Sequence, residues 1–336
     1  MIHIDGSQGE GGGQILRSSL ALSMATGKPF RIANIRAGRD KPGLKRQHLT
    51  CVRAAASICA AEVTGDEVGS MDVTFTPSAV TPGAYHFPIG TAGSTTMVLQ
   101  AILPPLQRAD YPSRITVEGG TYNKAAPPFD FFARVLVPLL NQLGPTITAH
   151  LERPGFFPAG GGRLVVEVQP TATPRPLALL ERGRATTHAA RAIISKLPAS
   201  IGDRELTVVG ERLGLPEDQL RIHEVRDALC PGNALCIELG YEHVTELFSS
   251  VGELGRSAES VAREAADQAR EYIASKAPVG PHLADQLMVP LALLAGGEYM
   301  TGRLTEHSTT NIRTIAAFGG EVVARPDGRV RVFAMR

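Results

Sequence analysis

The chain has 336 residues, of which 43% are hydrophobic and 20% are charged, a balance typical of a globular protein with a large core and more than one domain. Its net charge of +1 excludes the global basic field of a general nucleic-acid coat protein, so any nucleic-acid contact has to be local. The acidic start, MIHIDGSQGE, lacks the features of a signal peptide, and no apolar run reaches membrane-spanning length. We therefore expect a cytoplasmic protein that has no membrane partner and keeps its cysteines as free thiols.

The first 80 residues follow a β-α-β-α-β-β order. Glycine-rich and Pro-Gly loops precede the two helices, at 6–13 and 37–43. The predicted elements are a strand at 2–5, a helix at 14–27, a strand at 29–36, a helix at 44–61 and strands at 62–66 and 71–77.

The same order returns twice, which indicates a structural repeat. The second copy is continuous, whereas the third is interrupted after its opening strand. For the second copy we predict strands at 84–88, 113–119, 146–152 and 163–168, with helices at 95–106 and 129–144. For the third we predict strands at 175–182, 298–304, 320–324 and 329–334, with helices at 280–297 and 307–318.

The interruption predicts a smaller inserted α/β domain at 184–276, which ends in a long amphipathic helix. The predicted fold class is α+β, with two-layer α/β units. The core domain would comprise 1–183 and 277–336, divided into repeats at about 1–80, 81–170, and 171–183 plus 277–336.

The segment RLTEHSTTNIRTIAAFGG, 303–320, places His307 at the start of the last predicted helix, with Thr305 or Ser308 as its cap. Backbone N–H groups at a helix start favour anions and a neutral imidazole. A neutral imidazole beside a phosphate site is a potential nucleophile toward phosphorus. On this stretch alone, a helix cap or a surface histidine is the simpler explanation of the pattern.

Two further stretches carry charges suited to phosphate chemistry. In the glycine loop, Glu10 precedes Arg17 of the following helix; Glu10 is a candidate Mg²⁺ ligand or a solvated loop acid. Residues 31–53 contain seven Lys or Arg against one acid, around a Pro-Gly turn that enters a helix. This cluster favours phosphate binding over an ordinary solvated face.

The stretch HLADQ puts Asp285 and Gln286 on an otherwise apolar helix. Polar groups there need partners or a ligand, so a buried structural hydrogen bond and a ligand site both remain open.

Taken together, DGSQGEGGGQILR, IRAGRDKPGLKRQHL, GTAGS, FFPAGGG, HLADQ and EHSTTN, in this order, resemble the RNA 3′-terminal phosphate cyclase family over nearly the whole chain. The resemblance implies three repeated units and an inserted smaller domain. It also implies ATP-dependent formation of a 2′,3′-cyclic end on RNA that carries a 3′-phosphate, through a histidine–AMP intermediate and with Mg²⁺ or Mn²⁺. The oligomeric state stays open, with a homodimer as one alternative.

The family's functional positions match particular residues of this chain. His307 matches the nucleophile, and Asp285 would either orient its imidazole or hold metal. The other matching catalytic positions are Glu10, Arg17, Arg36, Arg39 and Gln47. The implied adenylate pocket comprises Gln100, Pro127, His282, Leu283, Ala284, Asp285, Gln286 and Phe248, the last stacking on adenine. Two positions depart from the family pattern: His282 stands where Tyr is common, and Pro154 where Arg or His is usual.

Two other functions compete with a catalytic cyclase. A non-catalytic, cyclase-like RNA-binding protein of ribosome assembly would lack the nucleophilic histidine, whereas His307 is present. An enolpyruvyl transferase built from the same unit would need six copies, for which 336 residues are too few.

Overall fold

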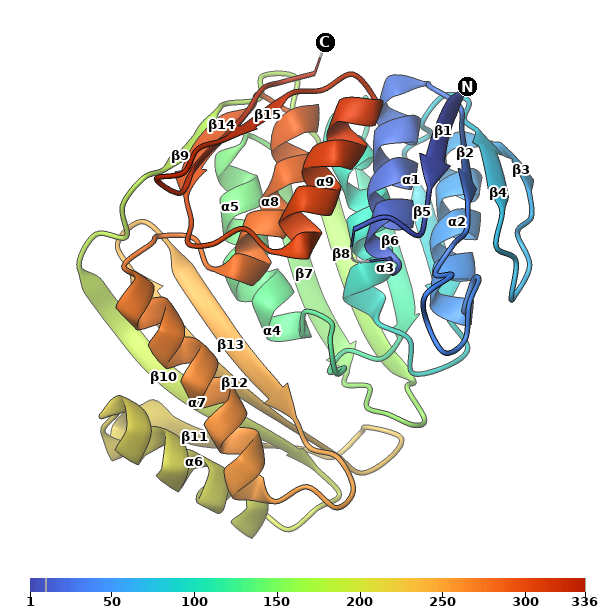
Figure 1. Cartoon of the computed structure of the whole chain (residues 1–336). Coiled ribbons are helices and arrows are strands. Elements are labelled where there is room, and N and C mark those ends of the chain that lie inside the picture. Colours follow the sequence, from blue (N-terminus) through green and yellow to red (C-terminus); the bar gives the residue numbers. More distant parts are fainter. Residues whose placement is uncertain (10, 336) are drawn as a thin grey trace.

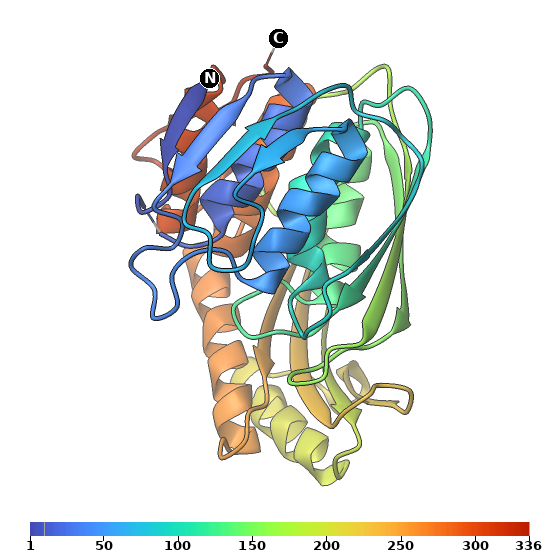
Figure 2. The same cartoon turned by 90° about the vertical axis from the view of Figure 1, so that its right-hand side faces the viewer.

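The computed structural model describes residues 1–9 and 11–335, and within them the strands form four sheets of four strands each (Figure 1). Three of these sheets surround a central group of helices (Figures 1 and 2). The fourth sheet, with two helices on one face, lies to one side. The predicted α+β class is confirmed.

The three sheets around the helices share one topology. In each, the first two strands pair in parallel, and the fourth strand lies antiparallel between the second and the third. The strand orders are β1-β2-β4-β3, β5-β6-β8-β7 and β9-β14-β16-β15. This shared order supports the predicted division into three units, whose residue boundaries stay a prediction.

The first two units are continuous in the chain. The first consists of β1 (Ile2–Asp5), α1 (Gln14–Thr26), β2 (Phe30–Ala33), α2 (Arg46–Cys59), β3 (Glu62–Thr64) and β4 (Val73–Thr76). The second consists of β5 (Ala84–Pro88), α3 (Thr95–Leu106), β6 (Ser113–Gly119), α4 (Phe129–Phe131), the π-helix η1 (Phe132–Leu136), α5 (Val137–Gln142), β7 (Thr146–Arg153) and β8 (Gly162–Gln169). The π-helix η1 interrupts the helix predicted at 129–144. It precedes Pro138, which has no N–H to continue the ladder.

The third unit is divided in the chain. It consists of β9 (Leu177–Leu179), α8 (Pro281–Leu293), β14 (Gly297–Met300), α9 (Glu306–Ala317), β15 (Val322–Ala324) and β16 (Arg329–Val332). β9 pairs in parallel with β14, from Leu177 opposite Gly297 to Leu179 opposite Tyr299. The chain therefore leaves this sheet after one strand and returns to it much later.

The intervening segment has its own sheet and its own hydrophobic cluster. It consists of β10 (Ala185–Ser195), α6 (Ser200–Leu213), the 3₁₀ turn η2 (Glu217–Gln219), β11 (Leu220–Val225), β12 (Gly232–Tyr241), β13 (Thr245–Val251) and α7 (Ala258–Ser275). Its strand order is β11-β10-β12-β13. The apolar face of α7, including Val261, Ala265 and Ala269, packs into a cluster separate from the main core. We call 184–276 the insertion; its limits as a domain stay a prediction.

Ion pairs join the insertion to the second unit. Arg191 of β10 lies 2.9 Å from the buried carboxylate of Asp130 on α4. Arg134 of η1 donates to both carboxylate oxygens of Glu238 on β12, at 2.5 and 2.8 Å. Bidentate pairs of this kind fix orientation as well as distance, so the insertion is held in a defined position against the core.

Two helices of the main core, α1 and α8, bury almost their whole surface. On α1, every residue from Gln14 to Met24 is buried, and α8 is buried from Leu283 to Leu293 except at Gln286. A helix enclosed in this way gives its rare polar side chains only protein or a cavity to contact. Among the described residues, no helix has both the length and the apolar character that crossing a bilayer requires.

A buried carboxylate connects the insertion to the start of α8. Glu246 of β13 is 1% exposed and accepts a hydrogen bond from the backbone N–H of Gly280 at 2.5 Å. Gly280 is the N-cap residue of α8. Burial raises the pKa of Glu246 to about 8, although that N–H bond and the charge of Arg182 act in the opposite direction.

This raised pKa predicts a pH-dependent stability. The folded protein retains the Glu246 proton up to about pH 8, whereas the unfolded chain loses it near pH 4.5, so folding is favoured at low pH. The contribution of Glu246 falls by up to about 1.4 kcal/mol per pH unit as pH rises between these values. The unfolding free energy of Glu246→Gln relative to the parent should therefore increase from pH 5 to pH 8 in denaturant titrations.

An exposed glutamate provides the matched control. Arg184 lowers the pKa of Glu242 through hydrogen bonds to its carboxylate, so Glu242→Gln should show no such increase over the same range. A pH-independent difference between Glu246→Gln and the parent would contradict the assignment of a buried, proton-retaining carboxyl.

Candidate active site

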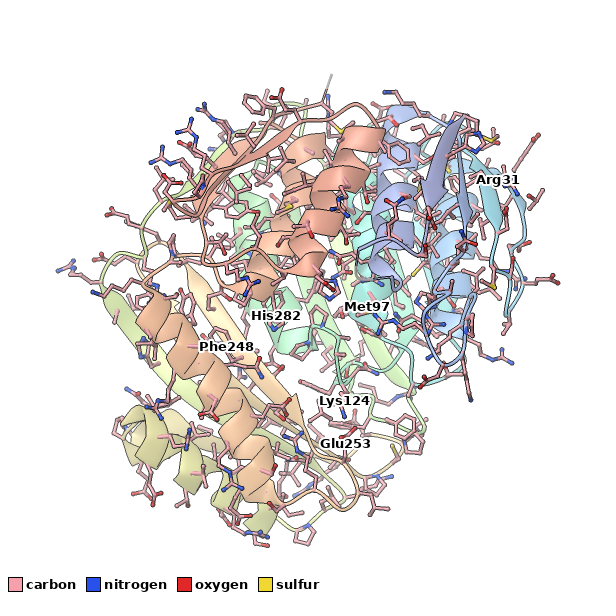
Figure 3. All side chains as sticks on the ribbon, viewed as in Figure 1. Arg31, Met97, Lys124, Phe248, Glu253 and His282 are labelled. Carbon is pink, nitrogen blue, oxygen red and sulfur yellow. The ribbon has the colours of Figure 1, made fainter. Side chains whose placement is uncertain are left out.

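A large cavity lies between the helical core and the insertion. It has a volume of about 460 Å³. Its walls come from the starts of α1, α8 and α9, from α3, from residues 123–128, and from β13 and α7. Lys124, in the wall of the cavity, pairs with Glu253 of the insertion at 2.9 Å, and both are labelled in Figure 3. The cavity therefore exists only because the insertion closes one side of it.

His307 lies in this cavity at the first turn of α9. Thr305, one of the two predicted caps, is the N-cap residue. Its side-chain oxygen accepts a hydrogen bond from the backbone N–H of Ser308 at 3.1 Å. The imidazole Nδ1 is hydrogen-bonded to Oε1 of Gln14, at the start of α1. Residues 293 positions apart are thus brought into direct contact.

The Gln14 amide defines the tautomer of His307. Nε2 of Gln14 donates to Oδ2 of Asp285 at 3.3 Å, so Oε1 of Gln14 is the atom that faces the imidazole. A carbonyl oxygen can only accept, and Nδ1 must therefore carry the proton. In the neutral ring the lone pair then resides on Nε2.

Asp285 is the centre of a buried polar network. It is 8% exposed and accepts from Gln14 and, at 3.2 Å, from Nε2 of Gln286. Burial raises the pKa of its carboxyl to about 7, against the opposing effect of these hydrogen bonds. Its backbone carbonyl accepts from Asn311 of α9 at 2.8 Å. Asp285 is thus connected to the imidazole through Gln14.

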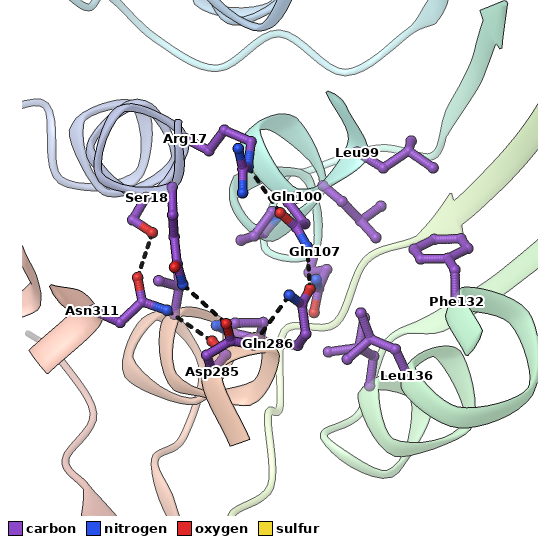
Figure 4. Close-up of a pocket in the computed structure, with 16 residues that line it drawn as sticks. Arg17, Ser18, Leu99, Gln100, Gln107, Phe132, Leu136, Asp285, Gln286 and Asn311 are labelled. Carbon is purple, nitrogen blue, oxygen red and sulfur yellow. Dashed lines mark hydrogen bonds between the residues drawn. The ribbon is translucent and has the colours of Figure 1, made fainter. Parts of the chain in front are cut away.

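The network continues to α3 and returns to α1 (Figure 4). Gln286 accepts from Nε2 of Gln100, and Gln100 accepts from Nε of Arg17 at 2.9 Å. Arg17 is 6% exposed and lines the same cavity as His307. The site therefore presents an imidazole, a guanidinium and several amides within one chamber, a set suited to an anionic, nitrogen-rich ligand.

The arginine-rich loop 36–43 lies beside this chamber rather than in its wall. The guanidinium of Arg36 is buried and donates to the carbonyls of Lys41 and Gly43 at 2.6 and 2.9 Å, while Arg39 is exposed. Gln47 accepts from the N–H of Ser94 at 2.7 Å and contacts Met97, which lines the cavity. The predicted phosphate roles of Arg36, Arg39 and Gln47 stay predictions.

A buried histidine reports the positive charge of this region. His48 lies behind the start of α1, and burial is the main cause that lowers its pKa to about 3. Three nearby cations lower it further; they are Arg17, Arg36 and Lys45. Arg17 in the cavity and Arg36 in the loop therefore act on the same location.

The glycine loop approaches α9 closely. A Cβ on Gly9, whose φ is +63°, would lie 2.1 Å from Oγ1 of Thr310. Only glycine combines that backbone conformation with so close a contact. Glu10, predicted as a catalytic residue and metal ligand, lies outside the described residues.

The predicted adenylate pocket is only partly assembled at the cavity. Five of its members line the wall: Gln100, Pro127, His282, Asp285 and Gln286. Leu283 and Ala284 face the hydrophobic core. The ring of Phe248 lies 5.3 Å from that of Tyr272, inside the cluster of the insertion. Its side chain is 3% exposed, and its stacking on adenine stays a prediction.

Several wall residues were not foreseen. They include Gln14 on the core side and Asn123, Arg256 and Gln268 at the insertion side. Gln14 directly follows the predicted glycine loop, a position that in retrospect favours a ligand or a functional contact. The others belong to the second unit's loop or the insertion, and no local motif distinguishes them.

Comparison with known proteins gives a consistent result. The sequence profile described as "RTC: RNA 3′-terminal phosphate cyclase" matches residues 8–324. The chain is 52% identical over 318 residues to the RNA 3′-terminal phosphate cyclase of Koribacter versatilis strain Ellin345, covering 95% of this chain and 90% of that protein. It is 49% identical over 317 residues to the protein of that name from Ectopseudomonas mendocina strain ymp, covering 94% and 92%. It is 48% identical over 318 residues to the protein of that name from Salmonella typhimurium strain LT2, covering 95% of this chain and 93% of that protein. The chain that places His307, Gln14 and Asp285 around one cavity belongs to the RNA 3′-terminal phosphate cyclase family.

Proposed function

We propose that the protein is an ATP-dependent enzyme that converts the 3′-terminal phosphate of RNA into a 2′,3′-cyclic phosphate through covalent adenylylation of His307. Membership in a family named for this reaction supports the overall activity. The observation that carries the mechanism is the hydrogen bond from Nδ1 of His307 to Gln14, since it leaves the lone pair on Nε2.

The reaction proceeds in three substitutions at phosphorus. First, Nε2 of His307 attacks the α-phosphorus of ATP; a nitrogen–phosphorus bond forms, and the bond to the departing pyrophosphate breaks. Second, an oxygen of the RNA 3′-phosphate attacks the adenylate phosphorus, and the nitrogen–phosphorus bond breaks, which returns the lone pair to Nε2. Third, the oxygen of the adjacent 2′-hydroxyl attacks the activated terminal phosphorus and its proton passes to solvent. The bond from that phosphorus to the bridging oxygen breaks, and AMP leaves with this oxygen.

The residues of the chamber have distinct tasks in this scheme. Gln14 and Asp285 hold the imidazole in the reactive tautomer. The guanidinium of Arg17 supplies positive charge beside the phosphates. Cyclisation requires mainly positioning, because the 2′-hydroxyl is already next to its target.

A divalent ion, Mg²⁺ or Mn²⁺, would neutralise charge on the triphosphate. Within the described residues, no group of three or more His, Cys, Asp or Glu side chains is arranged to hold a metal. A resident metal site made only of these residues therefore does not fit the structure. The expected metal ligand, Glu10, lies outside them, and no step above depends on the ion.

The activity is tested with RNA that carries a labelled 3′-phosphate. Incubation with ATP should make the label resistant to phosphatase, and the digested product should be a nucleoside 2′,3′-cyclic phosphate, with one AMP and one pyrophosphate formed per cyclised end. A label that remains fully sensitive to phosphatase, with ATP and either metal supplied, would refute the proposal.

Replacing Arg36 or Arg39 by alanine should impair cyclisation by about 1.5–3 kcal/mol of transition-state stabilisation, the range for charge-assisted hydrogen bonds. The reason is the local excess of cations around His48, in which Arg36 takes part. Steady-state kinetics measure the effect as a fall in kcat/KM. Because Arg36 also donates hydrogen bonds within its own loop, the Tm of the Arg36→Ala variant should be compared with that of the parent as well. Activity within twofold of the parent would remove either residue from the site.

A further inference from the structure

A second groove lies on the outside of the molecule, along α2. Its volume is about 260 Å³, and its walls come from α2 and from the end of β5. Helix α2 faces the viewer in Figure 2, away from the insertion. None of the residues that line this groove also lines the chamber of His307.

The α2 wall of the groove carries two arginines on one helical face. Arg46, Thr50 and Arg53 follow one another at spacings of four and three residues, which places them on the same side of a helix. Both arginines are exposed. Arg53 contacts Asp66 through Nε and one terminal nitrogen, at 3.0 and 2.9 Å, and its side chain stays 61% exposed.

The opposite wall is formed by Phe87, Pro88 and Ile89, with one aromatic ring among them. Phe87 lines the groove, and its ring stacks on that of Tyr85 with centroids 5.7 Å apart and planes 14° from parallel. Both rings belong to β5, an edge strand, and both are half-buried. Cations on one side and a fixed ring on the other match a single-stranded nucleic acid, whose phosphates bind arginine and whose bases stack on aromatic rings.

The groove begins beside the catalytic chamber. Arg46, the first residue of α2, is followed by Gln47, whose side chain contacts Met97 in the chamber wall at 2.9 Å. From Arg46 to Arg53 the helix rises roughly 10 Å, the length of a short stretch of extended strand. The chain's net charge is only +1, so this local excess of cations is not part of a general basic surface.

We propose that this groove binds the RNA nucleotides immediately upstream of the reacting 3′-phosphate. Arg46 and Arg53 contact their backbone phosphates, and Phe87 stacks on one base. This inference rests on the proposed function, since it assumes that the RNA end enters the chamber of His307. The interaction is independent of sequence, because phosphates and ring faces are common to all nucleotides.

The test compares RNA substrates of increasing length, from two to about ten nucleotides, each with a 3′-phosphate. For the parent, KM should fall as the RNA becomes longer. In Arg46→Ala, Arg53→Ala and Phe87→Ala, KM for the longest RNA should rise at least fivefold, with kcat and KM for the dinucleotide within twofold of the parent. For each lost phosphate contact, the slope of log KM against log salt should fall by about 0.7.

Arg204→Ala is the matched control. Arg204 forms an exposed pair with Glu259 at 2.7 Å, with side-chain exposures of 55% and 34%, against 61% and 42% for Arg53 and Asp66. It should behave as the parent at every length. The groove is refuted if KM in the parent does not depend on length, or if the variants lose the same factor on short and long RNA.

Failure of the proposed function gives a different result. In that case the parent itself would form no cyclic ends on any RNA. Labelling of the protein by ATP alone requires no RNA, so it should be unchanged in all three groove variants. Loss of that label would place the defect in the chamber and also refute the groove as a separate RNA-binding site.

Discussion

His307→Ala is expected to abolish covalent labelling of the protein by ATP that carries a radioactive α-phosphate, and to reduce RNA cyclisation to background. The variant removes the only atom that can form the nitrogen–phosphorus bond in the proposed scheme. Folding should be nearly unaffected, because the side chain is half-buried at a helix start and the Thr305 cap remains. Denaturing electrophoresis after incubation with ATP and a divalent metal measures the label directly.

The chemical behaviour of the label identifies the bond. A phosphoramidate withstands alkali and is cleaved by mild acid, so the label on the parent should do the same. His150→Ala, which removes an exposed imidazole on β7, serves as the control and should retain full labelling. RNA with a preformed adenylylated end should still be cyclised by His307→Ala, because that step bypasses the nucleophile. Labelling of His307→Ala, or a label that maps to lysine, contradicts the mechanism.

Gln14→Leu should slow self-adenylylation by about 10- to 100-fold. The variant leaves Nδ1 of His307 and the carboxylate of Asp285 without their shared amide, and an unsatisfied buried polar group costs about 1–3 kcal/mol. The imidazole is then no longer restricted to the tautomer with its lone pair on Nε2. Single-turnover labelling at saturating ATP measures the rate of this step without contributions from RNA.

Gln107→Leu is the matched control, because it replaces another buried glutamine in the same core. The amide of Gln107 has no hydrogen-bond partner within the described residues, and it takes no part in the network around His307. Its labelling rate should equal that of the parent.

The effects of Gln14→Leu and Asp285→Asn on the labelling rate should be less than additive, because both residues act through one hydrogen-bonded unit. Full additivity, or a normal rate in Gln14→Leu, would remove Gln14 from its positioning role.

The order of elements could be predicted because each has a local cause. Glycine and proline mark the loops between elements, and Thr305 caps α9. The alternation of strands and helices repeats along the chain. The fold class and the family are confirmed. The π-helix η1 before Pro138 was not predicted, because the apolar pattern continues through it.

The chemistry of the site was less accessible from sequence. Gln14 was missed because its two partners are 271 and 293 residues away, and its one local signal, the position directly after the glycine loop, does not specify a role. Phe248 is the opposite case, and its stacking on adenine stays a prediction. Its neighbours Leu247 and Ser249 line the chamber, but alternation along a strand turns the intervening ring to the other face, which in β13 is the interior of the insertion.

The division of the third sheet has a consequence for synthesis of the protein. Leu177 of β9 pairs opposite Gly297 of β14, so translation must proceed through 297 − 177 = 120 further residues before the partner strand exists. At 5–20 residues per second this takes roughly 6–24 seconds. During that interval the first two units and the insertion can complete their own sheets, whereas β9 waits without its neighbour. His307 is made later still, on the last helix, and meets Gln14 only when α9 packs on α1. In the proposed scheme, the nucleophile therefore becomes available only after α9 has been made and has packed on α1.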